Sequence, residues 1–522
     1  MPGNSRHHFW LLVVALFAVV AGVYFRVARL DRRLFWYDEC FTALKLSGHR
    51  FYVATDALLD GRVKSIAEAR QYQHLNPDRG WLETLQRCAG NDTQVAPLHC
   101  LILRIWAPLF GDSVWSLRAF SVLIGLLCVP AAAWLGHEVS AGEGVAATSI
   151  PIVAVILMAM SPFEVLFSQE AREYALWTLI VLLSSAALLR ALRSSTTGAW
   201  VAYAALTAIG LYSHLLHVLV VMAQAIVARR VSWRQFVLSG GAGMLALIPW
   251  IVLLVIQATP VQEHVSWTGT RIPIDVYARN AIRNIAAVAI DFGMADLTRG
   301  QLAAELLIVA CAGVALIWML RRARRGQAAG ASYLLVLLTL IVPVVLGSAD
   351  LLRRGGSRMV VARYLVPSYV GLILIFACVI GALLDSGLRR RQAAGWIALL
   401  LFLAASGFSC RLMSYSEDWW NKGASHLNLP CAEIVRSASN PLLIVEPVGS
   451  NFGNLLPLTH LLDDRLQIVG EPPADLDFSR FDRVLVYEPS DAFLQRVQRR
   501  SGMTATLVAN RNRANLYELR AP

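Results

Sequence analysis

The feature that most constrains this chain is a series of long apolar runs with almost no charged residues. Eleven such runs occur, near residues 9–23, 114–136, 146–161, 174–193, 199–212, 214–228, 236–257, 301–320, 331–347, 364–384 and 393–409. Strands of membrane barrels alternate apolar and polar residues, whereas these runs are continuous, so we expect helices. Only 16% of the residues are charged, against about 25% in soluble domains. The sequence therefore predicts a mainly α, polytopic helical membrane protein with about eleven spans.

Arginine clusters predict how these helices cross the membrane. Clusters within residues 190–193, 229–234, 321–325 and 389–391 all follow even-numbered runs. Short loops rich in arginine stay in the cytoplasm. All four clusters lie on that side if the N-terminus is cytoplasmic and the number of spans is eleven, whereas an even number would place at least one cluster outside. The first run continues into Tyr24-Phe25-Arg26 rather than a small-residue cleavage site, so we interpret it as a retained span. The formal charge of +12 then belongs to cytoplasmic loops, and no compact basic domain is present to bind nucleic acid.

The same parity places three larger pieces outside the cytoplasm, namely residues 26–113, residues 258–300 and everything after Cys410. We expect a membrane domain over residues 1–410, with residues 26–113 as its first outer loop, opened by the arginines between Arg26 and Arg33. Pro97–Phe110 is amphipathic, and at about 1.5 Å per residue it is too short to cross about 30 Å of hydrocarbon. It predicts a juxtamembrane helix.

Residues 411–522 predict a small extracytoplasmic α/β domain. Short β-like runs occur at 442–445, 466–469, 484–487, 504–508 and 516–519. Ser490 precedes a stretch with helical periodicity that ends at Arg500, which is typical of a capped helix. The tail has no glycine-rich phosphate fingerprint, so we expect an accessory role in binding or structure.

The cysteines and metal ligands are uninformative. Five of the eight cysteines, namely Cys40, Cys88, Cys100, Cys410 and Cys431, lie in the outer pieces or at their boundary, so one disulfide is an open alternative in an oxidising compartment. No CxxC pair and no metal-ligand spacing occurs. We assign no cofactor and leave the use of a divalent cation open.

An acidic pair lies directly after the first span, within Leu34-Phe35-Trp36-Tyr37-Asp38-Glu39-Cys40-Phe41-Thr42. Aromatic residues mark the membrane interface, and a carboxylate among them is partly desolvated and therefore more basic. An enzyme on the outer face has no nucleotide sugars, so its donor must be activated and delivered by the membrane, as a polyprenyl phosphate sugar is. Transfer would need a carboxylate base and cations for the leaving phosphate. The alternative is an ordinary solvated acidic pair at a helix start.

On these residues the chain resembles the GT-C class of integral-membrane glycosyltransferases, in the branch of the protein O-mannosyltransferases, the bacterial aminoarabinose transferase and their bacterial relatives. The resemblance implies that Asp38, with Glu39 beside it, opens the first outer loop and serves as the catalytic base. Further matching segments follow in order between residues 96 and 420, with Ala96 departing from the family's first proline. They are Ala96-Pro97-Leu98-His99, Phe110-Gly111-Asp112-Ser113, Leu117-Arg118-Ala119-Phe120-Ser121, Ser161-Pro162-Phe163, Ser168-Gln169-Glu170-Ala171-Arg172-Glu173-Tyr174, Arg363-Tyr364-Leu365-Val366-Pro367 and Glu417-Asp418-Trp419-Trp420.

The resemblance also implies roles for residues within these segments. Glu170 is a further catalytic candidate, and the alternative is that Glu170 and Arg172 form a structural pair with Asp38 or the first loop. Arg363 is the candidate for holding the lipid phosphate, since arginine binds phosphate bidentately, although Arg353, Arg354 and Arg358 lie close by and headgroup anchoring is an equal alternative. The other candidate substrate contacts within these segments are His99, Arg172, Tyr174 and Tyr364. His214 is a further candidate because Tyr212-Ser213-His214 resembles a Tyr-x-His of the family, with a structural histidine as the alternative.

These inferences predict an inverting glycosyltransferase of the inner (plasma) membrane. It would move a sugar from a polyprenyl phosphate to a glycolipid, polysaccharide or protein acceptor on the outer face, with membrane lipids as surroundings. Inversion follows from a single displacement with one carboxylate as base. The alternatives are a transporter or flippase of lipid-linked saccharides, and a polymerase or ligase that uses lipid diphosphate donors. Neither the sugar nor the acceptor is defined by the sequence.

Overall fold

The fold was obtained as a computed structural model, which describes residues 2–91, 93–141, 149–229, 231–257, 265–294, 297–325, 329–353, 355–511 and 514–521. It separates into two compact units, each described by itself below. The helical unit comprises residues 1–30, 92–99 and 118–415, and the sheet unit comprises residues 31–91, 100–117 and 416–522. The sequence predicts a boundary near residue 410 and assigns the first outer loop to the membrane domain. Most of that loop is instead grouped with the tail.

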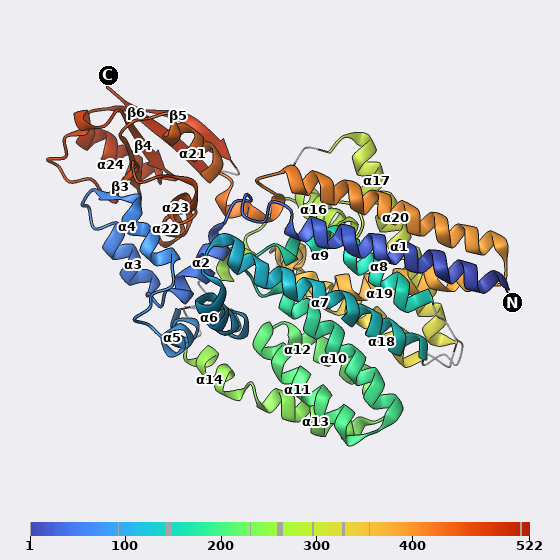
Figure 1. Cartoon of the computed structure of the whole chain (residues 1–522). Helices are drawn as coiled ribbons and strands as arrows, with labels where there is room; N and C mark the ends of the chain where they lie inside the picture. Colours follow the sequence, from blue (N-terminus) through green and yellow to red (C-terminus); the bar gives the residue numbers. More distant parts are fainter. Residues whose placement is uncertain are drawn as a thin grey trace. The chain divides into compact units, whose positions relative to one another are not determined.

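Seven helices within the described residues are long and apolar enough to cross a membrane, and two bent pairs of helices raise the number to nine. The seven helices are α1 (Pro2–Val27), α7 (Val114–Ala141), α10 (Tyr174–Ser194), α17 (Arg299–Arg324), α18 (Ala329–Leu352), α19 (Val366–Leu384) and α20 (Arg389–Tyr415) (Figure 1). The bent pairs are α8 (Ser149–Met160) with α9 (Pro162–Ser168), at 57°, and α13 (Trp233–Leu245) with α14 (Ile248–Ile256), at 48°. The chain is an integral membrane protein.

The two remaining predicted spans form shorter helices. They are α11 (Thr197–Ser213), of 17 residues, and α12 (His217–Ala228), of 12 residues. At 1.5 Å per residue they extend about 26 Å and about 18 Å, less than the roughly 30 Å of the hydrocarbon layer. Within the described residues each of the eleven apolar runs therefore contains helix, but only nine of them have the length of a span, each bent pair taken as one.

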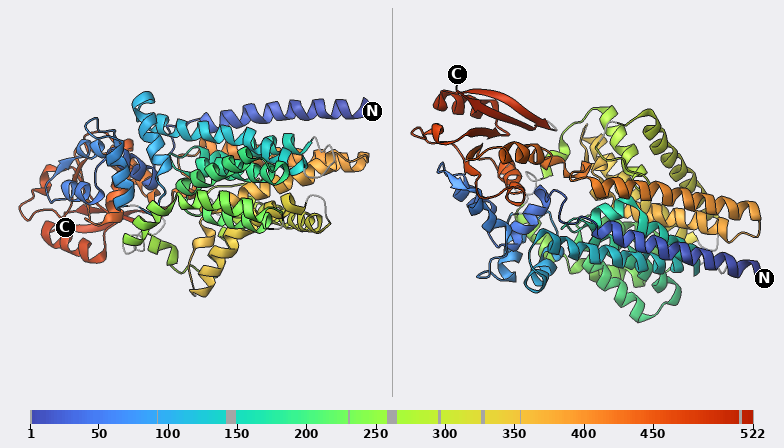
Figure 2. Two further views of the ribbon diagram at one scale, coloured as in Figure 1. Left: turned by 90° about the horizontal axis from the view of Figure 1, so that it is seen from below. Right: turned by 45° about the horizontal axis from the view of Figure 1, so that its top comes forward.

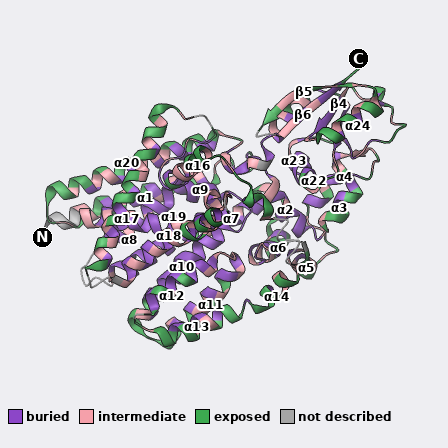
Figure 3. Cartoon of the chain, turned by 180° about the vertical axis from the view of Figure 1, so that it is seen from behind, coloured by how far each residue is buried: buried purple, intermediate pink, exposed green. Residues whose placement is uncertain are grey.

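Helix α19 lies at the centre of the helical unit. It packs against α8, α18 and α20, and both α10 and α19 are buried along most of their length (Figure 3). Two glycines allow this close packing: a methyl group at Gly371 would lie 2.8 Å from the carbonyl oxygen of Leu335, and one at Gly381 would lie 2.7 Å from Cγ1 of Ile150. Small residues at helix contacts are typical of membrane bundles.

Helix α1 runs beside α8 and contacts α20, and Figure 2 shows these long helices, from α1 in blue to α20 in orange, from two further sides. It is longer than the first apolar run, because it continues to Val27. Arg26 therefore does not open the loop, as the sequence suggests, but lies in the last turn of the helix with its side chain fully buried. The helical unit also contains the amphipathic α16 (Ile274–Ala286) and three 3-10 turns, η2 (Ser266–Gly269), η3 (Arg358–Val360) and η4 (Ala362–Leu365).

The sheet unit combines the first loop with the tail. The loop supplies α2 (Tyr37–Leu46), α3 (Phe51–Leu58), β1 (Lys64–Ser65), α4 (Ile66–Arg70), η1 (Gln71–Gln73) and α5 (Trp81–Asn91). The tail supplies η5 (Trp420–Ser425), α21 (Asn428–Arg436), β2 (Pro441–Val445), α22 (Gly449–Leu455), α23 (Leu458–Leu461), β3 (Gln467–Val469), η6 (Phe478–Arg480), β4 (Arg483–Tyr487), α24 (Asp491–Ser501), β5 (Thr504–Arg511) and β6 (Ala514–Arg520). The predicted juxtamembrane segment forms a helix, α6 (Leu98–Phe110).

The strands form one six-stranded sheet in the order β1-β3-β2-β4-β6-β5. The three central strands are parallel, with Leu443 of β2 between Ile468 of β3 and Leu485 of β4, and the outer strands are antiparallel. All five residues of β2 are buried, as a continuous apolar strand between parallel neighbours requires. The five strands predicted from the tail are confirmed. The sixth strand, β1, comes from the first loop and pairs with β3, which is one reason why the loop belongs to this unit.

Helix α24 packs on the sheet through Phe493 and Val497, which join a core with Leu442, Ile444 and Val484. Its predicted cap is confirmed, because the Ser490 hydroxyl accepts a hydrogen bond from the Phe493 amide at 3.2 Å. At the other end Gly502 has φ of 67°, a left-handed conformation that glycine adopts without strain.

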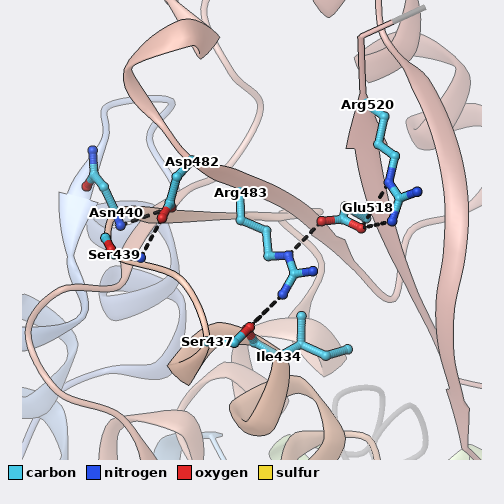
Figure 4. Close-up of polar contacts among 8 residues, drawn as sticks. All are labelled: Ile434, Ser437, Ser439, Asn440, Asp482, Arg483, Glu518 and Arg520. Carbon is cyan, nitrogen blue, oxygen red and sulfur yellow. Dashed lines mark hydrogen bonds and ion pairs between the residues drawn. The ribbon is translucent and has the colours of Figure 1, made fainter.

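A polar network fixes the edges of the strands to the helix α21 (Figure 4). Arg483 of β4 donates to Glu518 of β6 at 2.6 Å, to the Ser437 hydroxyl at 2.7 Å and to the Ile434 carbonyl at 3.2 Å. The last two acceptors lie at the C-terminal end of α21, where a cation is favourable. The carboxylate of Asp482 accepts from the amide of Asn440, which immediately precedes β2.

Candidate active site

The acidic pair occupies the first turn of α2 in the sheet unit. Asp38 and Glu39 are the second and third residues of this helix, where the unpaired amide groups and the helix dipole stabilise negative charge. The two carboxylates have different surroundings: the Glu39 side chain is fully buried, whereas Asp38 is partly exposed. The predicted helix start is therefore present, but only one of its two acids is open to solvent.

Glu39 is paired with a residue that the sequence did not identify. Its Oε2 atom lies 3.1 Å from Nζ of Lys422 in η5, and the lysine side chain is only 3% exposed. The Lys422 ammonium also lies 5.3 Å from the centre of the Trp36 ring. No sequence pattern predicts this pair, since its members are 383 residues apart. Glu39, a predicted catalytic residue, is held as one half of a buried ion pair.

The aromatic residues around the acidic pair pack within the sheet unit. Phe41 stacks on Phe51 with ring centres 5.3 Å apart, and Phe35 meets the ring of His460 edge-on at 4.8 Å. The backbone amide of Leu34 donates to the carbonyl of Glu417 at 2.9 Å. The aromatic patch that the sequence suggests as an interface marker is thus also a packing surface for the tail.

The second group of predicted residues lies in the helical unit, in the turn between α9 and α10. Glu170, Arg172, Glu173 and Tyr174 are all buried. Arg172 pairs with Glu173, with Nε 3.1 Å from Oε2, and its guanidinium lies 5.9 Å from the centre of the Tyr174 ring. The Glu170 carbonyl accepts from the Arg172 amide at 2.7 Å, which closes the turn. Arg172 thus pairs with Glu173 of the same turn, whereas the alternative interpretation expects a pair with Asp38 or the first loop.

Glu173 is the electrostatic centre of this group. Burial raises its pKa, but Arg172, His214 and His99 together outweigh burial and lower the pKa to about 2. A carboxylate with so low a pKa is a weak proton acceptor. Glu173 lies within one of the segments that resemble the family, but the resemblance assigns it no role. Its electrostatic interactions with His99 and His214 depend on tertiary contacts that no local sequence pattern contains.

The structure brings His214, Arg363 and Tyr364 to the same group. The ring of His214 stacks on Trp177 of α10 with centres 3.8 Å apart, and it lies 6.3 Å from the Tyr364 ring. Arg363 interacts electrostatically with His214. Trp177 also donates from Nε1 to Nδ1 of His217 at 3.3 Å, so one buried indole orients both histidines. Trp177 was not predicted, because an apolar residue within a span carries no signal of function.

Arg363 lies near two aromatic rings. Its guanidinium is 5.4 Å from the centre of the Trp267 ring and 5.9 Å from that of Tyr364. Arg358, a neighbouring candidate, is instead held by Asp350, with Nη1 2.9 Å from Oδ1. Arg353 is exposed, and Arg354 lies outside the described residues. We call Arg172, Glu173, His214 and the residues packed on them the Glu173 group. Of the described arginines in this cluster, Arg363 is the one that interacts with this group, through His214.

Arg26, which the sequence analysis assigns to the first outer loop, is buried beside the turn between α9 and α10 and donates hydrogen bonds to the residues before it. Arg26 donates to the carbonyls of Ala159 at 2.6 Å and Met158 at 3.1 Å, which are left without helical partners where α8 ends. It also donates to the Ser168 hydroxyl at 3.2 Å. Gln169 donates in turn to the carbonyl of Phe25 at 2.8 Å. The end of α1 therefore fixes the bend between α8 and α9.

The chain shows no disulfide or metal centre in the described part. All eight cysteines lie among the described residues, and none of them forms a disulfide. Across the described ranges, no group of three or more His, Cys, Asp or Glu side chains is arranged to hold a metal ion.

The fold is that of the GT-C class of integral-membrane glycosyltransferases. The chain superposes on apo ArnT from Cupriavidus metallidurans with a TM-score of 0.51 and 14% identity, and on the same enzyme bound to undecaprenyl phosphate with a TM-score of 0.50 and 12% identity, each covering 98% of both chains. An oligosaccharyltransferase from Archaeoglobus fulgidus, tethered to an acceptor peptide, matches at 0.50 and 13% identity over 88% of this chain and 64% of that one. No family model matches the sequence, and no curated protein matches it.

Proposed function

We propose that the protein is a glycosyltransferase that moves a sugar from a polyprenyl phosphate to an acceptor hydroxyl at the outer face of the membrane, with inversion. The GT-C fold supports this class of reaction, and ArnT, which shares the fold over 98% of both chains, binds undecaprenyl phosphate. The N-terminus is cytoplasmic in this proposal. The acidic turn, which is the first turn of α2 with Asp38 and Glu39, and the tail are extracytoplasmic. The acceptor is a glycolipid, a polysaccharide or a protein.

Asp38 is the catalytic base of the proposed reaction. The acceptor oxygen attacks the anomeric carbon, the bond from that carbon to the phosphate oxygen breaks, and Asp38 takes the hydroxyl proton. A single displacement of this kind inverts the anomeric centre. The observation that carries the assignment is the difference within the acidic pair: Glu39 is neutralised by Lys422 in a buried ion pair, whereas the partly exposed Asp38 sits at the favourable start of α2.

Arg363 binds the phosphate of the donor and of the leaving polyprenyl phosphate. Its planar guanidinium, close to the rings of Trp267 and Tyr364, carries paired N–H donors of the kind that phosphate oxygens accept bidentately. Glu173 is ionised at neutral pH and acts on the substrate through Arg172 and the histidines rather than as a base. His99, Tyr174, His214, Tyr364 and Glu170 contribute to substrate binding or orientation.

The test is the replacement Asp38→Asn. First, mass spectrometry of envelope glycolipids and glycoproteins, with and without the gene, identifies the product. A positioned general base contributes about 10²- to 10⁴-fold, so Asp38→Asn should reduce formation of that product by at least about 100-fold. Asp56→Asn is the matched control, because Asp56 is an exposed aspartate of the same loop. Product formation by Asp38→Asn at the rate of Asp56→Asn would reject the base and favour a transporter of lipid-linked saccharides.

A further inference from the structure

The tail contacts the acidic turn through two neighbouring side chains of η5. Lys422 pairs with Glu39 at 3.1 Å, and the hydroxyl of Ser425 accepts a hydrogen bond from the Tyr37 amide at 3.0 Å. Tyr37 is the first residue of α2, and Trp36 before it makes no side-chain cap. The tail therefore supplies the cap that this helix lacks, together with the counter-charge of its third residue.

The contact is backed by a chain of polar groups that leads into the sheet. Ser425 lies 3.5 Å from Oδ1 of Asn454, and Nδ2 of Asn454 donates to Glu488, directly after β4, at 3.1 Å. Asn428 of α21 donates to the Asn454 carbonyl at 2.9 Å. Gly453 presses against α2 so closely that a methyl group there would lie 2.2 Å from the Tyr37 ring. The start of α2 is thus held by a fixed part of the tail.

A buried ion pair contributes little net free energy to the stability of a fold. Removing two charges from water costs several kcal/mol for each ion in real proteins, and well-packed apolar residues of similar volume often stabilise a fold as well or better. What a hydrogen-bonded ion pair adds is a defined geometry for the groups that form it. Since Glu39 follows Asp38 in the same helical turn, fixing Glu39 also fixes the backbone from which the Asp38 side chain projects.

We propose that Lys422 is a positioning residue, which orients Asp38 for proton abstraction by fixing and neutralising Glu39, with Ser425 as its helper. This inference rests on the proposed function, because it assigns Lys422 a role through Asp38. It gives the tail a part in the reaction, where the sequence suggests an accessory domain. Lys422 does not contact the donor in this proposal.

The experiment measures turnover and donor binding separately in the full-length protein. Turnover is followed as polyprenyl phosphate released from a lipid extract of the host membranes, and binding is measured with undecaprenyl phosphate. Lys422→Met should reduce turnover about 10- to 100-fold, the scale of a misplaced catalytic group, and leave the undecaprenyl phosphate affinity within about twofold. Lys422→Arg, which keeps the charge, should restore most of the turnover. Loss of affinity together with turnover, or no rescue by arginine, would overturn the positioning role.

Lys64→Met is the matched control. Lys64 belongs to the same unit and pairs with Asp60 at 2.8 Å, but it lies in β1 rather than against α2. The Lys64→Met variant should have the same turnover rate as the unaltered protein. Equal turnover of Lys422→Met and Lys64→Met, in a preparation in which Asp38→Asn is inactive, contradicts the inference and leaves the proposed function intact. An unaltered protein that neither releases polyprenyl phosphate nor binds undecaprenyl phosphate contradicts the proposed function itself.

A second variant decides the question if Lys422→Met does not fold. Ser425→Ala removes the acceptor for the Tyr37 amide and the contact with Oδ1 of Asn454, and it leaves the ion pair of Glu39 and Lys422 in place. It should lower turnover several-fold at unchanged undecaprenyl phosphate affinity, and unchanged turnover would count against the role of the tail.

Discussion

The acidic turn and the Glu173 group are held in different ways. The acidic turn of the sheet unit is fixed by Lys422 and Ser425, which are 383 and 388 residues from their partners. The Glu173 group of the helical unit is built on a break between consecutive helices, with Arg172 and Glu173 adjacent in the chain. The comparison teaches that two motifs of similar appearance in a sequence depend on very different amounts of tertiary structure.

The difference has an energetic consequence. The ion pair of Arg172 and Glu173 is formed by neighbours, so little chain must be ordered to make it. The ion pair of Glu39 and Lys422 exists only when the first loop and the tail have folded together, as the pairing of β1 with β3 also requires. Damage to the tail should therefore reach the acidic turn, whereas the Glu173 group should respond chiefly to changes in α1, α8 and α10.

The largest effect on the helical unit should come from Arg26→Met. The change leaves the carbonyls of Met158 and Ala159 without their arginine donor, and it removes the positive charge of Arg26 that interacts with the buried Glu164. Breaking a buried charge network typically costs about 3–5 kcal/mol. We expect a large fall in the unfolding temperature of the detergent-solubilised protein. Arg411→Met, at an exposed arginine of α20, should change it little. Equal falls for both variants would show that the bend between α8 and α9 does not depend on Arg26.

Much of the fold could be predicted from the sequence because it depends on local patterns. Continuous apolar runs identified the long helices, and alternating or buried short runs identified the five strands of the tail. Strand β1 was missed because a two-residue strand, Lys64–Ser65, has no periodicity to detect. The bend after Met160 was missed as a bend, although the predicted span ended beside it, because an apolar run does not show where Pro162 starts a new helix.

The candidate site was predictable only as a set of residues. Motif order placed Arg172, His214 and Arg363 among the candidates, and the structure brings them together around Glu173. Their neighbours Trp177 and Trp267 went unnoticed because single aromatic residues are common in such a chain. Arg26 was assigned to a loop because arginine at the end of an apolar run normally marks the interface, and only the unpaired carbonyls of a broken helix explain its burial.

A smaller effect, with a defined dependence on pH, should come from Glu173→Gln. A folded-state pKa of about 2, lowered from 4.5, corresponds to roughly 3 kcal/mol of stabilisation when the group is ionised. Because the pKa is lowered, this stability is fully present above about pH 4.5 and is lost as the pH falls toward 2. Unfolding temperatures measured from pH 7 to pH 3 should therefore show a gap between the unaltered protein and Glu173→Gln that narrows on acidification. Glu433→Gln, at an exposed glutamate of α21, should show no such gap, and a gap that widens at low pH would refute the ionised state of Glu173.

The smallest expected effect is on donor binding and comes from replacing Arg363. Hydrogen bonds to charged groups contribute about 1.5–3 kcal/mol, so Arg363→Ala should weaken the binding of undecaprenyl phosphate by about tenfold or somewhat more. Arg363→Lys should give an intermediate value, because lysine keeps the charge but loses the planar contact with Trp267 and Tyr364. Arg279→Ala removes an exposed arginine paired with Asp275 and should leave binding unchanged. If Arg363→Ala instead lowers acceptor use and donor use equally, its effect is on the Glu173 group as a whole, and the phosphate must be bound by other residues. Lys422→Met, which acts on the other group, should leave the same affinity intact, so the two variants together test whether donor binding and base positioning belong to separate parts of the chain.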